Sequence, residues 1–312
     1  MKILVTGGTG YIGSHTCVQL IEKGWQPVII DSLVNSKISV LDRIQQITGT
    51  RPAFIEGDVR NADLLQKVLT EHAIEAVIHF AGLKAVGESV SMPLKYYDNN
   101  VHGSVVLMQA MKQCHVKTLV FSSSATVYGD SSEPPWSEQV PTSPTNPYGQ
   151  SKLMVDQIMA DAAVSDATCS MTSLRYFNPV GAHSSAIIGE FPIGIPNNLV
   201  PFITQTAAGI QEQLTVFGND YPTEDGTCIR DYVHVQDLAD AHIAAMKFVE
   251  GSDPGFTAIN IGTGSGTSVY EVLEMIQDVT GISIEPILGQ RREGDPPALV
   301  ADVSLAKEIL GW

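Results

Sequence analysis

The stretch that decides the fold is Thr6-Gly7-Gly8-Thr9-Gly10-Tyr11-Ile12-Gly13, which follows an apolar run at 3–5 and opens an amphipathic segment. Its glycines allow a tight turn, and they let backbone N–H groups and a helix N-terminus approach a pyrophosphate. Asp31 ends the next apolar run, 18 residues after Gly13, where a carboxylate that binds a ribose belongs. Because these features occur in the right order, we expect a dinucleotide site. Asp31 would repel a 2′-phosphate, so NAD is favoured over NADP.

Outward from this turn, apolar runs alternate with amphipathic segments through the first half of the chain. We expect strands at 3–5, 28–31, 53–56, 76–81, 118–122 and 170–175, and a long helix from about 93 to 114. Runs that are apolar throughout indicate strands buried on both faces, as in a parallel sheet covered by helices. The pattern predicts an α/β fold with a doubly wound parallel sheet of the Rossmann type. In such a sheet the ligand lies outside the carboxyl ends of the strands.

The residue composition of the chain changes after Arg175, since residues 177–201 are rich in Asn, Pro and Gly. We therefore divide the chain into an NAD-binding domain, residues 1–176, and a smaller mixed α/β C-terminal substrate lobe, residues 177–312, which we expect to interleave with the first domain. Helices are expected near 199–209, 235–249 and 269–280, and short strands near 214–217, 229–234 and 257–261. A loop rich in Pro, Ser and Thr is expected at 131–147.

The charge excludes several classes of partner. The 312 residues carry a net charge of −16, which argues against nucleic acid and anionic membranes. No apolar run approaches the ~18 residues that a membrane span needs. The chain begins directly with a strand and has four widely spaced cysteines, so we expect a cytoplasmic protein. Residues 156–312 carry 6 Lys and Arg against 21 Asp and Glu, so an anionic substrate there must be held by a few placed arginines.

A second motif, Tyr148-x-x-x-Lys152, follows the serine run 122–124. Residues four apart on a helix share one face, which would put an ammonium beside a phenol. A nearby positive charge favours the phenolate, and lowering a tyrosine pKa by about 3 units needs about 4 kcal/mol. A serine hydroxyl could complete a proton path. The pattern alone is weak, and an exposed Tyr and Lys on an ordinary helix would look the same.

Taken together, the glycine turn, the serine strand and Tyr-x-x-x-Lys resemble the extended short-chain dehydrogenase/reductase family. Within it, the chain is most similar to members that invert C4 of a UDP-sugar, and the resemblance covers essentially all of it. The most specific segments are 80–89, 96–100, 122–129, 175–182, 218–227, 230–232 and 291–295.

The resemblance implies a set of site residues and no metal ligand. Ser124, Tyr148 and Lys152 would be catalytic. The NAD site would contain Gly7, Gly10, Tyr11, Ile12, Gly13, Asp31, Ser32, Leu33, Asn35, Ser36, Asp58, Val59, Phe80, Ala81, Gly82, Lys84, Asn99, Ser122, Tyr148, Lys152, Tyr176 and Phe177. The UDP-sugar would contact Ser124, Tyr148, Asn178, Asn198, Leu199, Val216, Phe217, Arg230, Arg292, Asp295 and Leu299. From the residues alone, Asp58 could equally be a loop cap. Surface bridges of Arg230 with Asp231 or of Arg292 with Asp295 are possible as well, but they explain less.

The resemblance also implies an activity, the interconversion of UDP-glucose and UDP-galactose in galactose metabolism. The reaction would oxidise C4 with tightly bound NAD, rotate the 4-keto sugar and reduce it again, in a homodimer. Lys152 would lower the pKa of Tyr148 and bind the nicotinamide ribose. Leu299 stands where relatives restricted to plain hexoses have tyrosine, so we expect weaker turnover of UDP-N-acetyl sugars as well.

Two other functions stay open. A nucleotide-sugar 4,6-dehydratase has Asp-Glu where this chain has Ala125-Thr126, so that reaction is disfavoured. An NAD-binding regulator without turnover would keep the fold, although the intact Ser124, Tyr148 and Lys152 argue against it. The family usually continues beyond the Gly-Trp that ends this sequence. We therefore expect the final helix to be absent and apolar surface of the small lobe to be exposed.

Overall fold

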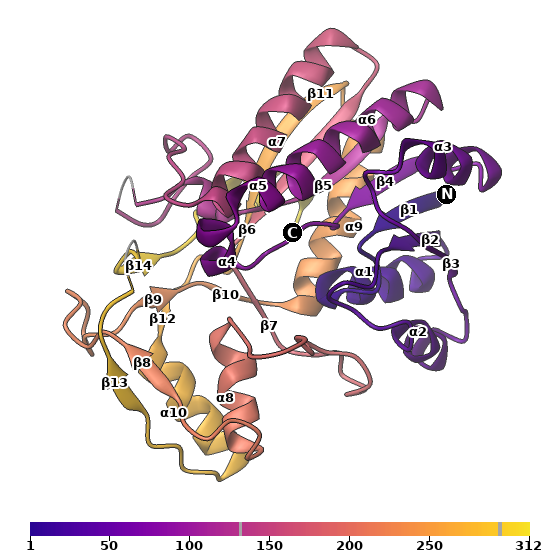
Figure 1. The fold of residues 1–312 in the computed structure, drawn as a ribbon. Helices are drawn as coiled ribbons and strands as arrows, with labels where there is room; N and C mark the ends of the chain where they lie inside the picture. Colours follow the sequence, from indigo (N-terminus) through magenta and orange to yellow (C-terminus); the bar gives the residue numbers. More distant parts are fainter. Residues whose placement is uncertain (131–132, 293–294) are drawn as a thin grey trace.

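The computed structural model describes residues 1–130, 133–292 and 295–312, and it is built around a seven-stranded sheet (Figure 1). Every neighbouring pair in the sheet is parallel. The strands, in sheet order, are β11 (Gly255–Ile261), β6 (Ser170–Tyr176), β5 (Thr118–Ser124), β4 (Ala76–His79), β1 (Lys2–Thr6), β2 (Gln26–Asp31) and β3 (Ala53–Glu56). The predicted strands and the doubly wound fold class are confirmed. The order reverses between β1 and β4, which is where ligands bind in such sheets.

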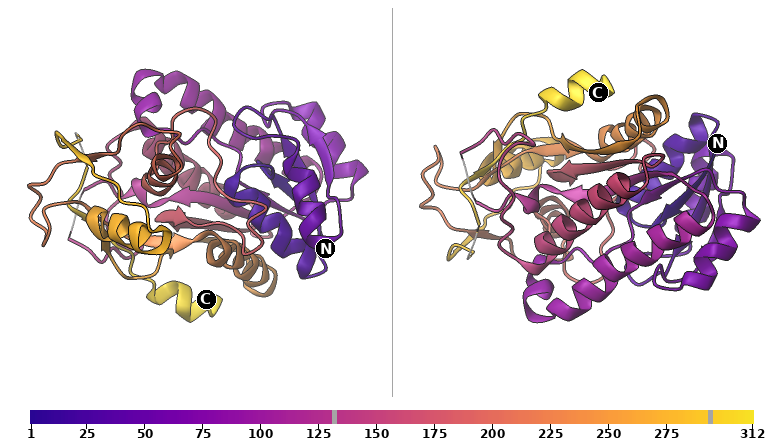
Figure 2. Two further views of the ribbon diagram at one scale, coloured as in Figure 1. Left: turned by 90° about the horizontal axis from the view of Figure 1, so that it is seen from below. Right: turned by 90° about the horizontal axis from the view of Figure 1, so that it is seen from above.

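Helices cover both faces of the sheet, as the views from below and above show (Figure 2). On β1, Ile3 and Val5 face one layer while Leu4 faces the other, because successive side chains of a strand alternate. The first layer comprises α1 (Tyr11–Glu22), α2 (Val40–Thr48) and α9 (Val235–Gly251). The second comprises α3 (Ala62–Glu71), α6 (Gly103–Gln113) and α7 (Pro147–Ser165). Burial on both faces explains why these strands are apolar throughout.

The long helix predicted at 93–114 is confirmed in a modified form. It consists of α5 (Pro93–Tyr96), a π-helical turn η1 (Tyr97–His102) and α6, and the short helix α4 (Val86–Ser91) precedes it. The π turn carries the buried Asn100, whose side chain accepts from Leu83 N at 2.8 Å and donates to Leu83 O at 3.0 Å. The turn therefore fastens the segment that follows β4.

The smaller lobe is made of short sheets and two helices. Its elements are β7 (Asn178–Val180), α8 (Leu199–Ala207), β8 (Thr215–Phe217), β9 (Ile229–Arg230), β10 (Tyr232–His234), β12 (Thr267–Ser268), α10 (Val269–Thr280), β13 (Ile287–Gly289) and β14 (Ala298–Leu299). The expected helices and strands of this half are confirmed. The run expected as one strand at 229–234 is two, because β9 pairs with β12 and β14 whereas β10 pairs with β7.

The two parts of the chain interleave. After the first elements of the lobe, α9 and β11 return to the large sheet and its helical layer. The division at residue 177 stays a prediction. Residues 131–132 of the loop expected at 131–147, and residues 293–294 of the segment 291–295, lie outside the described residues.

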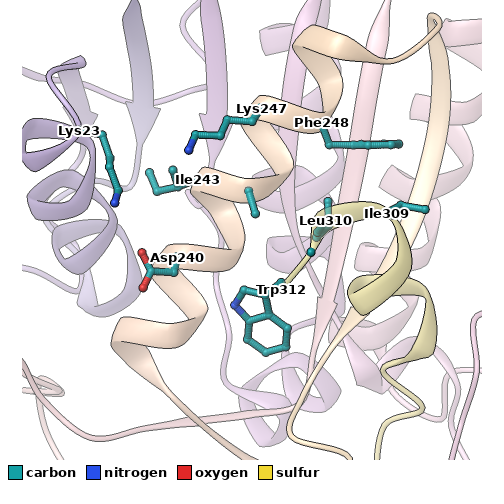
Figure 3. Close-up of a pocket in the computed structure, with 10 residues that line it drawn as sticks. Lys23, Asp240, Ile243, Lys247, Phe248, Ile309, Leu310 and Trp312 are labelled. Carbon is teal, nitrogen blue, oxygen red and sulfur yellow. The ribbon is translucent and has the colours of Figure 1, made fainter.

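The last residues pack on the sheet domain and not on the small lobe. A second π turn, η3 (Ala306–Leu310), lies against α9, and the Trp312 indole donates to Asp237 O at 2.9 Å. Together with α9 and with Lys23, the residue after α1, they line a pocket of about 400 Å³, where Lys23, Asp240 and Lys247 lie to one side and the side chains of Phe248, Leu310 and Trp312 to the other (Figure 3). The expectation that apolar surface of the small lobe would be exposed stays a prediction. Within the described ranges, no helix is long and apolar enough to cross a membrane.

Candidate active site

A cavity of about 2040 Å³ opens at the carboxyl ends of the large sheet and extends to the small lobe. All predicted site residues line it except Leu33, which instead donates its N–H to Asp31 Oδ1 at 2.9 Å from a left-handed backbone conformation (φ 57°). The predicted cofactor, catalytic and substrate residues are therefore gathered in one space. Among the described residues, no group of three or more His, Cys, Asp or Glu side chains could hold a metal ion.

The glycine turn is built for close approach. Gly7 adopts a positive φ of 72°, and a Cβ at this position would lie 2.7 Å from Ala81 N. A Cβ on Gly13 would lie 2.4 Å from Gly7 O, so α1 can start directly beneath the turn only with glycine there. No side chain caps the N-terminus of α1 at Gly10. The free N–H groups of that first turn and the helix dipole suit a diphosphate.

Asp31 is held rigidly at the end of β2. Besides Leu33 N, its carboxylate accepts from Thr9 N at 3.2 Å and from Ser36 Oγ at 3.1 Å. These bonds join the glycine turn to the loop after β2, so the carboxylate has a fixed position at the cavity wall. The geometry suits a carboxylate that accepts hydrogen bonds from a ribose.

Asp58 is a loop cap, one of the two roles that the sequence left open, and its role at the cofactor stays a prediction. It lines the cavity, and it also caps its own loop by accepting from Arg60 N at 2.9 Å and Arg60 Nε at 3.0 Å. The hydrogen bonds from Arg60 lower the pKa of Asp58. The carboxylate therefore stays charged at the edge of the cofactor end.

Tyr148 and Lys152 project from the first turns of α7, on the face that borders the cavity. Pro147 occupies the first position of the helix, and Asn146 caps it by accepting from Gly149 N at 2.9 Å. Lys152 is buried, and its Nζ donates to Ser122 O at 2.6 Å and lies 5.9 Å from the centre of the Tyr148 ring. The helix thus places the lysine between the tyrosine and the end of β5.

The pKa values in the protein alone differ from the expectation that Lys152 lowers the pKa of Tyr148. Burial raises the pKa of Tyr148, and hydrogen bonding to Ser124 opposes this rise. Burial also lowers the pKa of Lys152 to about 8, with the Asp156 carboxylate opposing that change. The reason is that the Lys152 ammonium bonds to a carbonyl and not to the phenol. Desolvation therefore outweighs the charge effect that helical spacing suggested.

The small lobe supplies the predicted substrate arginines. Arg230 donates to Asp295 Oδ1 at 2.7 Å and to Pro296 O at 2.9 Å, whereas the Arg292 guanidinium stacks 4.1 Å from the centre of the Phe217 ring. The surface pairings considered from the sequence, Arg230 with Asp231 and Arg292 with Asp295, are therefore wrong. Asp231 is instead buried, and its carboxylate accepts from the backbone N–H groups of Thr263, Gly264 and Ala301.

Glu190 is a site residue that sequence reasoning missed. Its largely buried Oε1 accepts from Lys84 Nζ at 3.0 Å and from Asn198 Nδ2 at 2.8 Å. It therefore links a residue expected at the cofactor with one expected at the substrate. No local signal marks Glu190, because it lies in the Gly- and Pro-rich segment and its partner Lys84 is 106 residues away.

Comparisons with known proteins agree with this geometry. The family model of the NAD dependent epimerase/dehydratase family matches residues 3–262. A UDP-glucose 4-epimerase of Yersinia pestis is 57% identical, over 100% of this chain and 92% of that protein. A UDP-glucose-4-epimerase structure from Stenotrophomonas maltophila, with NAD and a formylated UDP-arabinopyranose, has a TM-score of 0.97 at 50% identity and covers 100% of this chain and 93% of that one.

A second solved structure is similar to this chain over its whole length. A UDP-glucose 4-epimerase from Bifidobacterium longum, in complex with NAD+ and UDP, has a TM-score of 0.96 at 47% identity, covering 100% of this chain and 93% of the other. The family model alone spans most of the sequence, from β1 to the end of β11. This chain belongs to the NAD dependent epimerase/dehydratase family.

Proposed function

We propose that this protein interconverts UDP-glucose and UDP-galactose by NAD-dependent oxidation at C4, rotation of the 4-keto sugar and re-reduction. The observation that carries the proposal is one cavity with three parts. Tyr148 and Lys152 border it between the glycine turn of α1 and the cavity-lining arginines of the small lobe. The relatives named above, which share about half or more of their residues with this chain, support the same activity.

The residues present fit NAD. The cradle at Gly7 and Gly13 has no room for a Cβ, the N-terminus of α1 has no side-chain cap, and the Asp31 carboxylate is fixed at the cavity wall. We propose that these groups bind the diphosphate and the adenosine ribose, and that Lys152 binds the nicotinamide ribose. NAD bound there would supply hydride transfer at C4 of the sugar, first as acceptor and then, to the opposite face, as donor. Because each cycle restores it, NAD behaves as a bound cofactor.

The protein handles the proton of the sugar's 4-hydroxyl. Tyr148, as the phenolate, accepts this proton, and Ser124 donates a hydrogen bond to the phenolate oxygen. The buried Lys152 ammonium compensates the negative charge that burial otherwise disfavours. The second transfer reverses the first, since Tyr148 returns the proton to the oxygen at C4 when the ketone is reduced.

The substrate is held by its diphosphate and nucleotide. Of the six Lys and Arg residues after 156, Arg230 and Arg292 line the cavity, in a half of the chain that is otherwise acidic. A planar guanidinium can bond two phosphate oxygens at once. Rotation of the keto sugar requires that the nucleotide be held firmly while the sugar is held loosely.

The competing dehydratase activity lacks its acid/base pair. Ala125 is buried in a core cluster and Thr126 lines the cavity, and neither carries a carboxylate. A regulator without turnover would bind NAD and leave UDP-sugars unchanged. One experiment separates the three functions: purified protein is incubated with UDP-galactose without added NAD, and the products are resolved by chromatography. We expect UDP-glucose. A 4-keto-6-deoxy product would indicate the dehydratase, and unchanged substrate with bound NAD would indicate the regulator.

We further propose that the protein is a cytoplasmic homodimer, as the family resemblance implies. The four cysteines are free, which is compatible with a reducing compartment. Light scattering of the purified protein measures the oligomeric state directly, and a monomer at micromolar concentration would contradict the proposal.

Cofactor selection is expected to depend on Asp31. Extraction of the purified protein should release NAD and little NADP, and Asp31→Asn should raise the NADP share because it removes the charge that repels a 2′-phosphate. Glu56 is the register partner of Asp31 on β3 and does not line the cavity, so Glu56→Gln is the matched control and should leave the ratio unchanged. Recovery of mostly NADP from the wild type would show that Asp31 does not face the ribose.

Substrate breadth is expected to depend on Leu299. This residue lines the cavity, packs against the core cluster around Trp136 and Phe177, and stands opposite Arg230 in the β14–β9 pairing. Leu299→Tyr should lower turnover of UDP-N-acetyl sugars relative to UDP-galactose, because a rigid ring crowds the acetamido group. Steric discrimination of this kind is worth about 1–3 kcal/mol, so we expect a graded change in the ratio of kcat/KM values.

Leu299→Met is the control for that experiment, because it keeps an apolar side chain of similar volume. It should leave the ratio close to that of the wild type. Equal losses for both substrates in Leu299→Tyr, or a wild type without any N-acetyl turnover, would contradict the steric argument.

A further inference from the structure

The hydroxyl of Ser124 is held by Thr126. Ser124 is the last residue of β5 and the N-cap of the short 3₁₀ helix η2 (Ala125–Val127). Its Oγ accepts from Thr126 N at 3.2 Å and from Thr126 Oγ1 at 3.0 Å. Thr126 itself lines the active-site cavity, yet neither the sequence motifs nor the similarity to relatives gave it a role.

These two bonds decide what the Ser124 hydroxyl can do. A serine hydroxyl has one proton to donate and two lone pairs that accept. Both accepting positions are used by Thr126, so the proton of Ser124 points away from η2. Ser124 and Tyr148 line the same cavity, and hydrogen bonding between them acts to lower the pKa of Tyr148 against the effect of burial. In this arrangement Ser124 is a donor to the tyrosine oxygen.

The backbone makes the arrangement rigid. A Cβ on Gly149, the residue after Tyr148, would lie only 2.7 Å from the Thr126 carbonyl oxygen. The turn that carries Thr126 is therefore in direct contact with the first turn of α7. Val127 is fully buried, and the Tyr128 N–H closes the turn on Ala125 O at 3.1 Å. Thr126 is thus fixed relative to both Ser124 and Tyr148.

We propose that Thr126 is a positioning residue of the reaction, whose hydroxyl holds Ser124 as a hydrogen-bond donor to the Tyr148 oxygen. The inference rests on the proposed function and deepens it. When the phenolate forms, Ser124 stabilises it by donating its proton in a hydrogen bond. Without the Thr126 hydroxyl, Ser124 regains a free lone pair and can turn its proton elsewhere. No proton leaves the pair, so the effect is on the stability of the phenolate and not on the balance of the reaction.

The test uses substitutions of nearly equal size. Thr126→Val removes the hydroxyl and keeps the volume and the backbone N–H, whereas Thr126→Ser keeps the hydroxyl. We expect Thr126→Val to lower kcat about tenfold, as for one lost hydrogen bond to a charged group, with KM and NAD content nearly unchanged. The acid limb of its pH–kcat profile should move to higher pH, because the phenolate is less stable. Thr126→Ser should keep kcat and the acid limb of the pH profile close to those of the wild type.

Controls separate positioning from general damage. Thr70→Val makes the same chemical change on α3, outside the cavity, and should leave kcat unchanged. In the Ser124→Ala background, Thr126→Val should have no further effect, because Thr126 acts through Ser124. A kcat within twofold of the wild type, an undiminished effect in that background, or a change confined to KM would overturn the proposal.

A spectroscopic readout keeps this test independent of turnover. Ultraviolet difference titration of the NAD-bound protein, with Tyr148→Phe as the blank, follows the phenolate itself. Thr126→Val should shift the Tyr148 pKa upward and Thr126→Ser should not. If the wild type leaves UDP-galactose unchanged, the proposed function fails while this titration still decides whether Thr126 positions Ser124.

Discussion

Tyr148→Phe is expected to lower kcat by about 10²–10⁴-fold, which is the usual effect of removing a general base. The substitution deletes the oxygen that we propose takes the substrate proton and keeps the ring in place on α7. Bound NAD and the Kd for UDP should stay close to the wild-type values, because Arg230 and Arg292 and the glycine turn lie elsewhere in the cavity. Single-turnover kinetics measure the loss in the chemical step, and cofactor extraction measures the bound NAD separately.

The control for this variant is another tyrosine of the same cavity. Tyr96 is buried, and its hydroxyl donates to Ala85 O at 2.8 Å. Tyr96→Phe should cost stability and little of kcat. Near-normal turnover in Tyr148→Phe would refute the assignment of the base, and loss of NAD in parallel with activity would point to a structural role.

Lys152→Met should have the second-largest effect, a loss of about 10²–10³-fold in kcat together with a lower NAD content. The substitution removes the ammonium that compensates the phenolate, so the pKa of Tyr148 should rise further. The thermal stability of Lys152→Met, in contrast to its activity, should not fall. Burial has lowered the pKa of Lys152 from 10.5 to about 8, which corresponds to a cost of about 3 kcal/mol for the charged form. Methionine avoids this cost and loses the bond to Ser122 O, so the Tm should be unchanged or higher.

The pH dependence follows from the same shift. Between pH 8 and 10.5 the unfolded chain binds more protons at Lys152 than the folded protein, so this group makes the wild type more stable as pH rises through that window. Activity needs the ammonium, so kcat should fall as pH rises through about 8. Lys152→Arg keeps the charge and should move this alkaline limb to higher pH. Lys247→Met, in the small pocket of Figure 3, is the matched control and should leave the pH profile unchanged. An alkaline limb that stays in place in Lys152→Arg would contradict the assignment.

The sequence predicted the parts of the fold that depend on local rules. The turn at 6–13 and the strand that ends at Asp31 are recognisable because backbone geometry requires glycine at defined spacings. The pair Tyr148 and Lys152 was recognisable because helical spacing puts residues four apart on one face. The apolar runs predicted the parallel sheet because strands covered on both faces must be apolar throughout.

The sequence could not decide which distant residues meet. The partner of Arg230 is Asp295 and not the adjacent Asp231, and Glu190 bonds to Lys84 across 106 residues. These pairings depend on how β9, β14 and the segment after β7 are brought together. On a strand, the next residue in the chain places its side chain on the opposite face of the sheet. The side chain that a residue bonds to therefore comes from another element.

What the sequence by itself determined was the sheet, the cofactor turn and the identity of the candidate base, because each follows from geometry within a few residues. The tertiary structure alone decided the electrostatic state of that base and the direction of its hydrogen bonds. The pKa of Tyr148 is raised and not lowered, because the folded chain buries its side chain away from water. The Lys152 ammonium donates its hydrogen bond to Ser122 O. The turn that carries Thr126 rests against the first turn of α7 because Gly149 has no side chain there. Desolvation and tertiary contacts depend on atoms from many parts of the folded chain, so a local pattern of residues cannot predict them.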